Sequence, residues 1–299
     1  MVVVEEWFDT SRRWSGATLD LAEELILRPD AKEIGVVLWP GYQLFDYEIS
    51  KFPDLFERCH TKRFLTKEEM KKFPSKYKSG FYYEMYTIEG GRYMAWLMKR
   101  FREIGGTVQI KQVKSFDELA DSHDVVVNCT GFGARELCGD SSVEPVRGQV
   151  IRMKAPWIKT FYISTLANQG KGDVAYIIPN LDAIILGGTG QVGDFNEEVD
   201  KNDKEYIMRE TLLLEPSLAN AEFICDNVGL RPSRPTVRLE IEDVAVSGLK
   251  SKKRTLKVVH NYGHGGAGIT LHWGCAADAV QLVLQCIDQS KKLKPISKL

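Results

Sequence analysis

The sequence feature that most constrains the fold is a glycine-rich run near the C-terminus, Gly263-His264-Gly265-Gly266-Ala267-Gly268. An apolar stretch with strand character precedes it at residues 255–260, and a helical pattern continues over residues 269–287. A strand that enters a glycine loop and then a helix gathers backbone N–H groups and the positive end of a helix dipole at one point. Pyrophosphates are held in this way, so the run predicts a dinucleotide site. A tight structural turn is the alternative reading, since a single glycine motif is weak evidence.

Two other glycine runs compete with this one. The run from Gly188 to Gly193 has the GxGxxG spacing after a strand, but Asp194, Glu197 and Glu198 follow it. Carboxylates would repel a pyrophosphate there, so we interpret this run as a turn. Gly131-Phe132-Gly133 reads as a turn from a strand into a helix, and whether it lines a cofactor stays open.

Composition narrows the class of partner. The chain has 299 residues, 43% hydrophobic and 27% charged, which is typical of one large or two ordinary globular domains. Forty basic residues against forty-one acidic ones give a net charge of −1, which leaves no broad electrostatic footprint for nucleic acid or an anionic membrane. No apolar run has membrane-spanning length, and the six cysteines show no CxxC pair. We expect a soluble, intracellular protein with reduced thiols, Cys129 and Cys275 among them in the core, and a small-molecule partner.

The last three residues, Ser297-Lys298-Leu299, spell the peroxisomal address that an import receptor reads. They follow a polar tail at the free end of the chain, where a receptor can reach them. A chance tripeptide is the alternative.

Hydrophobic periodicity predicts a mixed α/β (α+β) fold. Helices are expected at residues 15–27, 66–73, 91–104 and 197–214, with Thr66 as an N-cap. Strands are expected at residues 34–38, ending at Pro40-Gly41, and at residues 107–113. Residues 124–129 have an apolar centre typical of a covered parallel strand. A strand-rich antiparallel region follows, with strands at residues 149–153, 161–164, 174–178 and 183–186.

Three arginines, Arg231, Arg234 and Arg238, lie along a proline-stiffened extended stretch at residues 229–238. A guanidinium can bind a carboxylate through two parallel hydrogen bonds, so one of them is a candidate substrate anchor, with surface ion pairs as the alternative. Arg231 and Arg234 differ by an odd offset and should point to opposite faces of a strand. Tyr176 lies in an apolar strand and is read as a core tyrosine by default. No set of side chains has metal-ligand or nucleophile spacing.

A long series of motifs resembles the D-amino-acid oxidase and D-aspartate oxidase family. The order and spacing hold from about Trp14 to the end of the chain, which makes the resemblance far more specific than one glycine motif. The motifs are Val127-Asn128-Cys129-Thr130-Gly131, Pro145-Val146-Arg147-Gly148-Gln149-Val150, Ala155-Pro156-Trp157, Tyr176-Ile177-Ile178-Pro179, Gly229-Leu230-Arg231-Pro232 with Arg234-Pro235, and His260-Asn261-Tyr262-Gly263-His264-Gly265-Gly266.

The resemblance implies an FAD flavoenzyme that oxidises a D-amino acid to an imine, which water converts to a 2-oxo acid and ammonia. O₂ then reoxidises the flavin and leaves hydrogen peroxide, which fits a peroxisomal matrix location. The resemblance also implies a Rossmann-like FAD-binding domain from residues 1–33, 105–145 and 229–299. A strand-rich antiparallel substrate domain would comprise residues 34–104 and 146–228.

Site residues follow from the resemblance by motif. Arg231 would bind the substrate carboxylate, Tyr176 would hydrogen-bond the same group, and the Gly266 carbonyl would accept from the ammonium group. FAD contacts are expected at Val127, Gly265, Gly266, Ala267, Gly268, Ile269 and Thr270. No side chain receives a catalytic role, because the flavin performs the redox chemistry.

Two departures from the family pattern define the alternatives. The family begins with a strand, a GxGxxG turn and a helix, and this chain starts beyond that first βαβ unit, so a catalytically inactive member without flavin is the rival reading. Members that prefer D-aspartate commonly carry arginine where Gly190 stands here, which leaves acidic against neutral substrates open. The partners expected are a D-amino acid, O₂ and the peroxisomal import receptor, and homodimer formation stays open.

Overall fold

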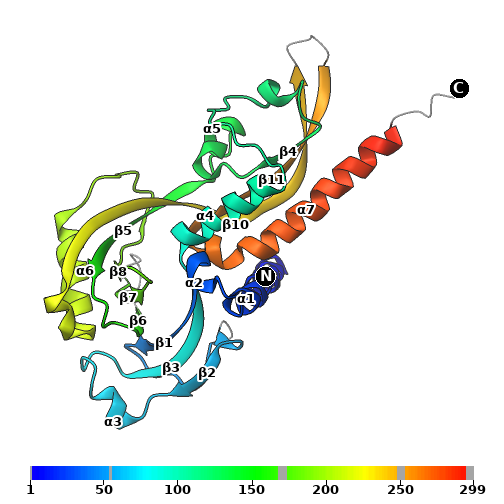
Figure 1. Cartoon of the computed structure of the whole chain (residues 1–299). Helices are drawn as coiled ribbons and strands as arrows, with labels where there is room; N and C mark the ends of the chain where they lie inside the picture. The colour runs from blue at the N-terminus through cyan, green and yellow to red at the C-terminus, as the bar shows by residue number, and fades with distance from the viewer. Residues whose placement is uncertain (1, 54–55, 168–173, 248–252, 294–299) are drawn as a thin grey trace, which may run out of the picture. The chain divides into compact units, whose positions relative to one another are not determined.

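A computed structural model describes residues 2–53, 56–167, 174–247 and 253–293 (Figure 1). The chain forms two compact units. Unit 1 comprises Met1–Leu21, Thr107–Glu144 and Arg231–Leu299, and unit 2 comprises Ala22–Gly106 and Pro145–Leu230. Helices and strands alternate in a mixed α/β fold, as predicted. Residues 22–33, which the sequence-based division placed with the first domain, lie in unit 2, and the assignment of FAD and substrate to the two domains stays a prediction.

Unit 2 is built on a sheet in the order β2-β3-β1-β6-β7-β8-β5, with β9 paired to β5. Its neighbours are antiparallel except β1 and β6, which are parallel. The predicted antiparallel, strand-rich region is therefore confirmed. The strands are β1 (Val36–Phe45), β2 (His60–Phe64), β3 (Ser79–Ile88), β5 (Glu144–Lys154), β6 (Phe161–Thr165), β7 (Tyr176–Pro179), β8 (Ile184–Gly187) and β9 (Gln191–Val192).

Strand β1 continues through Pro40-Gly41, so the predicted end of this strand is wrong. The antiparallel partner β3 pairs with it along its whole length, from Val36 to Phe45. Gly41 fits because a side chain there would collide with the neighbouring strand: a Cβ atom would lie 2.2 Å from the Phe161 ring. The Pro-Gly pair signals a close approach inside the sheet here instead of a turn.

Two helices of unit 2 begin at recognisable side-chain caps. Thr66 caps α3 (Lys67–Met70) in a capping box with Glu69, which confirms the predicted N-cap. Helix α6 (Lys201–Leu214) starts later than predicted because the Asp200 side chain accepts from two backbone N–H groups of its first turn. The remaining helical segments are α2 (Ala31–Ile34), α4 (Gly90–Glu103) and η4 (Pro216–Asn220).

The largest core of unit 2 lies between the strands and α6. Ile151, Ile177 and Leu186 from three neighbouring strands pack with Ile207 of α6, and all four are fully buried. Full burial of such a side chain stabilises a fold by about 1.5–3 kcal/mol. The sheet is therefore fixed at the strands that carry Tyr176 and Gly187.

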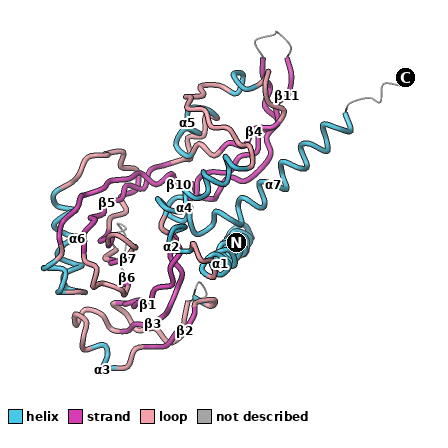
Figure 2. The backbone as a smooth tube through the Cα atoms, in the orientation of Figure 1, coloured by secondary structure: helices cyan, strands magenta, loops and turns pink. Residues whose placement is uncertain are grey.

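Unit 1 contains a sheet in the order β10-β11-β4, formed by β10 (Glu222–Ser247), β11 (Lys253–His264) and β4 (Val125–Asn128). Figure 2 shows β10 and β11 as a long pair, and β4 runs parallel to β11, as predicted. Residues 107–113 form no strand, contrary to the prediction, and Ile110 is fully exposed. We expected β4 to be covered on both faces. That prediction is wrong for the described residues, since the side chain of Val127 is 45% exposed.

Two long helices pack together in unit 1. Helix α1 (Val2–Ile26) begins earlier than predicted, and its part within unit 1 lies against α7 (Gly268–Leu293). Gly274 of α7 allows the contact, because a Cβ atom there would lie 2.3 Å from the Trp14 Cα. Asp278 accepts hydrogen bonds from Arg13 and from the Trp14 indole. Short helical segments complete the unit: η2 (Phe116–Leu119), η3 (Gly131–Gly133), α5 (Ala134–Leu137) and η5 (Gly265–Ala267).

The structure also bears on the expectations about cysteines, membrane-spanning helices and metal ligands. All six cysteines lie in described positions and are free thiols; Cys275 is buried, but Cys129 is exposed, contrary to the prediction. Among the described residues, no helix combines the length and apolar character needed to cross a membrane. The same residues contain no cluster of three or more metal-ligating side chains.

Candidate functional site

The glycine loop of unit 1 lies against the arginine-rich stretch of β10. A Cβ atom at Gly266 would lie 3.4 Å from the Cδ of Arg231, and one at Gly263 would lie 2.7 Å from the Cδ of Arg234. Gly263 also has a φ of +89°, which L-residues with side chains rarely adopt. Glycine is therefore required at the point where the loop crosses the arginine stems. The structure brings together Arg231 and Gly266, two of the three predicted substrate-binding residues.

The loop leads directly into α7, a helix of 26 residues with no acidic side chain in its first turn. Its N–H groups and the positive end of its dipole are available to an anion. Gly266, Ile269 and Thr270 are exposed, while Ala267 and Gly268 are partly buried. A helix N-terminus that follows a glycine loop, with no acidic residue in its own first turn, has the chemistry that a pyrophosphate requires.

Strand β4 ends beside β11, which continues to His264. His260 pairs with Asn128 in the parallel ladder, and Val127 pairs with Val259. Because the carboxyl ends of parallel strands meet at one edge of a sheet, the turn after Asn128 and the glycine loop lie at the same edge, where α/β sheets bind ligands. Val127 is exposed on β4, so it is accessible to a cofactor.

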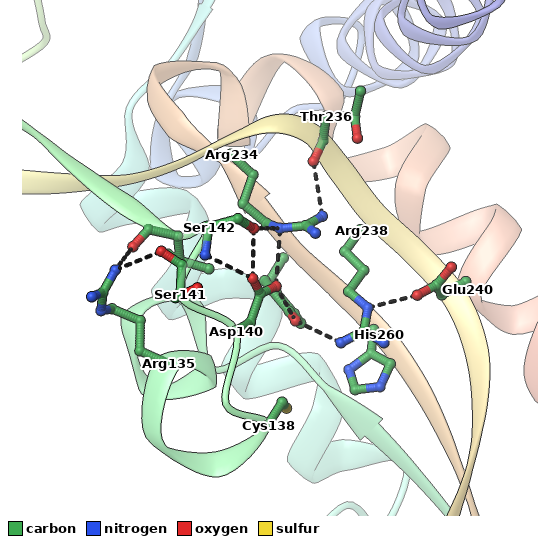
Figure 3. A network of polar contacts seen from close by, with 12 residues as sticks. Arg135, Cys138, Asp140, Ser141, Ser142, Arg234, Thr236, Arg238, Glu240 and His260 are labelled. Atoms are coloured by element: carbon green, nitrogen blue, oxygen red, sulfur yellow. Dashed lines mark hydrogen bonds and ion pairs between the residues drawn. The ribbon is translucent and has the colours of Figure 1, made fainter. Parts of the chain in front are cut away.

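A polar network supports this edge of unit 1 (Figure 3). Asp140 accepts a hydrogen bond of 2.8 Å from the Tyr262 hydroxyl and lies 3.0 Å from the Arg234 guanidinium. Arg238 donates to the same Tyr262 hydroxyl at 3.0 Å and pairs with Glu242 at 2.7 Å. The network therefore joins the segment after α5 to both long strands, β10 and β11.

The network shifts the pKa values of its members. Burial alone would raise the pKa of Asp140, but hydrogen bonds from Ser142 and Tyr262 outweigh burial and lower it. Burial raises the pKa of Tyr262 to about 12. Burial would lower the pKa of Arg238, but its hydrogen bonds to Tyr262 and two glutamates raise it. Asp140 and Arg238 are therefore charged at neutral pH, and Tyr262 is neutral.

Tyr176 lies in unit 2, on β7, with its ring against β8. A Cβ atom at Gly187 would lie 2.1 Å from the Tyr176 Cζ, and one at Gly188 would lie 2.9 Å from its hydroxyl oxygen. The next residue, Thr189, is buried and accepts a hydrogen bond from the Gln149 N–H at 2.9 Å. The run from Gly188 to Gly193 contains the short strand β9 and ends in a turn at Gly193; it opens no helix, in line with its interpretation as a structural segment of the strand-rich region.

Arg147 anchors the chain around this turn. Its side chain is 1% exposed and donates to the carbonyl oxygens of Asn196 and Glu198, both at 2.7 Å. It also binds the Asp203 carboxylate at 2.6 Å and the side chains of two glutamines, Gln149 and Gln191. The guanidinium thus ties β5 to the segment that follows β9.

Sequence reasoning missed the contacts of these network residues. A detectable signal exists for two of them: Arg147 and Gln149 are polar residues two apart in a strand, and they lie on the same face as the apolar Ile151. Asp140 carried no such signal, because the partners that tie it to the long strands, Tyr262 and Arg234, lie about a hundred residues away in the chain. The place of Tyr176 relative to Arg231 stays a prediction, and Ser297, Lys298 and Leu299 lie outside the described residues.

Comparisons with known proteins show which proteins this chain resembles. The family described as FAD dependent oxidoreductase matches residues 4–282. D-aspartate oxidase of Homo sapiens is 38% identical over 291 residues, which cover 97% of this chain and 82% of the relative. D-amino acid oxidase of Dugesia ryukyuensis is 36% identical, with 94% of this chain and 82% of the relative covered.

The solved structure of glycine oxidase from Geobacillus kaustophilus has a TM-score of 0.65 to this chain at 19% identity, and it shows the shared fold. The match covers 94% of this chain and 79% of that one. With the family description matching most of its length and relatives well above 30% identity, this chain belongs to the FAD-dependent oxidoreductase family of the D-amino-acid oxidases.

Proposed function

We propose that this protein oxidises D-amino acids with FAD and O₂, and that a 2-oxo acid, ammonia and hydrogen peroxide are the products. The observation that carries the proposal is the close approach of Arg231 to Gly266, which brings a guanidinium side chain beside the glycine loop that leads into α7. D-aspartate oxidase and D-amino acid oxidase among the relatives support the same reaction class. They do not favour the rival reading, a member without flavin.

The residues have separate tasks in this proposal. Arg231 binds the substrate carboxylate through two charge-assisted hydrogen bonds, which fix its position and orientation. The Gly266 carbonyl accepts from the ammonium group, and the Tyr176 hydroxyl donates to the carboxylate. Together these contacts orient the Cα–H bond of the substrate towards the flavin, and correct orientation alone can contribute several kcal/mol to catalysis.

FAD, when bound, supplies the oxidising chemistry by accepting hydride from the Cα atom. The residues that would hold it are Val127 on β4 and the run from Gly265 to Thr270. The backbone N–H groups at the start of α7 would bind its phosphates.

An absorbance spectrum of the purified protein, followed by turnover of an Arg231 series, tests the proposal. Bound flavin and turnover are expected in the parent protein. Arg231→Ala should lower kcat/KM by about 100-fold or more, and Arg231→Lys should recover part of it, because truncating one partner of a charged pair costs about 2–5 kcal/mol. Arg209→Ala is the control, since Arg209 is largely exposed on α6. A colourless protein, or near-parental turnover in Arg231→Ala, would contradict the proposal.

A comparison of kcat/KM for D-aspartate and D-alanine measures the substrate preference. Gly190 brings no charge to this position, whereas an arginine would bind a second carboxylate. A higher kcat/KM for D-alanine is therefore the expected result, and a preference for D-aspartate would point to another cationic residue as its anchor.

We further propose that the protein resides in the peroxisomal matrix through its last three residues. A hydrogen-peroxide product supports this location, since peroxide would then form inside the organelle. Imaging of a protein tagged at its N-terminus tests the address: deletion of Ser297-Lys298-Leu299 should leave the tag in the cytosol. An unchanged punctate pattern would show that these residues are not the address.

A further inference from the structure

A buried histidine lies behind the turn that follows β4. His260 is fully buried on β11, and its two ring nitrogens face different partners. Nε2 lies 2.9 Å from the Glu242 carboxylate, and Nδ1 lies 3.1 Å from the Asn128 side-chain nitrogen. The role of each nitrogen depends on the orientation of the Asn128 amide.

The hydrogen bonds of Thr130 fix that orientation. The Thr130 backbone N–H can only donate, and it donates to the Asn128 side-chain oxygen at 3.2 Å. The Thr130 hydroxyl donates to the same oxygen at 2.7 Å. The Asn128 NH₂ group must therefore face His260, so Nδ1 accepts and the single ring proton resides on Nε2, towards Glu242.

The turn that Asn128 holds after β4 lies against residues of β10. Gly131 follows Thr130 with a φ of +56°, and a Cβ atom there would lie 3.4 Å from the Pro232 ring. Pro232 is the residue next to Arg231, whose stem lies against Gly266. In unit 1, hydrogen bonds therefore link His260, Asn128 and Thr130, and Gly131 lies next to the Pro232-Arg231 segment that carries the candidate carboxylate anchor.

We propose that neutral His260 is a positioning residue: it fixes the Asn128 amide, which holds the turn through Gly131 and thereby the Pro232-Arg231 segment. Addition of a second proton to Nδ1 would place two donors against each other. The Asn128 amide then has to turn away from Thr130 or lose its contact with His260. The inference about substrate binding rests on the proposed function, whereas the inference about the turn does not.

The groups packed around His260 favour the neutral ring. Burial and the positive Arg238 lower the pKa of His260, while Glu242 and Glu240, also on β10, act in the opposite direction. Phe116 and Tyr262 cover the ring edge-on, and Cys138 accepts from the same Asn128 NH₂ group. Because the folded-state pKa lies below 6.5, neutral His260 holds the turn at pH 7, and protonation opposes it as the pH falls below 6.5.

Amide exchange and histidine NMR of the full chain test the proposal at pH 7.5 and pH 5.5. With ¹⁵N-labelled histidine, the His260 signals should report the Nε2–H tautomer at pH 7.5. Exchange of the Thr130 amide, corrected for intrinsic pH dependence, should become about tenfold less protected at pH 5.5, which corresponds to the loss of one hydrogen bond. His123→Gln, a change at an exposed histidine, is the matched control and should leave both results unchanged.

The Asn128→Asp variant should restore protection of the Thr130 amide at low pH, a result that a merely structural role of His260 would not produce. A carboxylate at position 128 accepts from both Thr130 and a protonated Nδ1, so the pKa of His260 should rise and the Thr130 amide should stay protected at pH 5.5. Asn128→Ala should leave Thr130 poorly protected at both pH values. An Nδ1–H tautomer at pH 7.5, or equal loss of protection in the parent and Asn128→Asp proteins, would overturn the proposal.

The same variants connect the turn to substrate binding. In the flavin-loaded enzyme, acidification should raise KM for a D-amino acid more in the parent than in Asn128→Asp, with a smaller effect on kcat. Equal KM profiles would separate the turn from Arg231 and overturn that part of the inference. If no flavin binds, the proposed function fails, but the exchange results still decide the role of His260.

Discussion

Replacement of Arg147 by methionine should destabilise unit 2 more than most single changes. The guanidinium is 1% exposed and makes five hydrogen bonds. Its removal therefore leaves carbonyl and side-chain oxygen atoms without a donor at a place that water cannot easily reach. Methionine approximates the length of the side chain and avoids a large cavity. The perturbation therefore isolates the loss of charge and hydrogen bonds.

The magnitude follows from the partners that remain. Asp203 loses its cation at 15% exposure, and removal of one member of a buried ion pair costs about 3–5 kcal/mol. The carbonyls of Asn196 and Glu198 also lose their donors, while Gln191 continues to donate to Asp203. We expect a loss of about 4 kcal/mol for Arg147→Met and about half of that for Arg147→Lys, which keeps the charge but has fewer donors.

Urea unfolding combined with hydrogen exchange of the β5 and α6 amides measures this loss within unit 2. Lys201→Ala is the matched control, because its ion pair with Glu205 lies in solvent at 3.7 Å and exposed pairs contribute about 0–1 kcal/mol. If Arg147→Met costs no more than Lys201→Ala, the reasoning that treats buried hydrogen-bonded charge as structurally essential is refuted for this site.

Two glycine replacements test close contacts inside each unit. Gly187→Ala should cost about 1–3 kcal/mol in urea unfolding and raise KM for a D-amino acid, because the new methyl group would displace the Tyr176 ring; Gly229→Ala, which has open space around it, should change neither quantity. Gly274→Ala meets the Trp14 backbone, which cannot swing aside as a ring can, so exchange of the α1 amides should accelerate at least about tenfold. Unchanged protection of α1 would show that the two helices tolerate a wider separation.

Local signals in the sequence predicted much of this fold correctly. The strands around Ile151, Ile177 and Leu186 carry apolar β-branched runs that predict buried strands whatever their partners are. Thr66 with Glu69 specifies a helix start within four residues, so it is visible without tertiary information. The contact between Arg231 and Gly266 followed from the family resemblance and not from a local pattern.

Predictions failed where distant residues decide the outcome. Pro40-Gly41 resembles a turn until Phe161, more than a hundred residues later, requires a position without a side chain. The run at residues 107–113 has strand composition, but no described strand pairs with it. Likewise, the partners of Asp140 and His260 arise only when β10 and β11 meet the end of β4, which no local pattern encodes.

The division of the chain into interleaved segments has a consequence for biosynthesis. All the residues of unit 2 have been translated once Leu230 is added, whereas unit 1 still lacks its last and longest segment. Since a nascent polypeptide emerges N-terminus first, helix α1 and strand β4 must wait for that segment before they can be covered. A ribosome that stops early in it would release a product with one foldable half and one half whose apolar surfaces are left for chaperones.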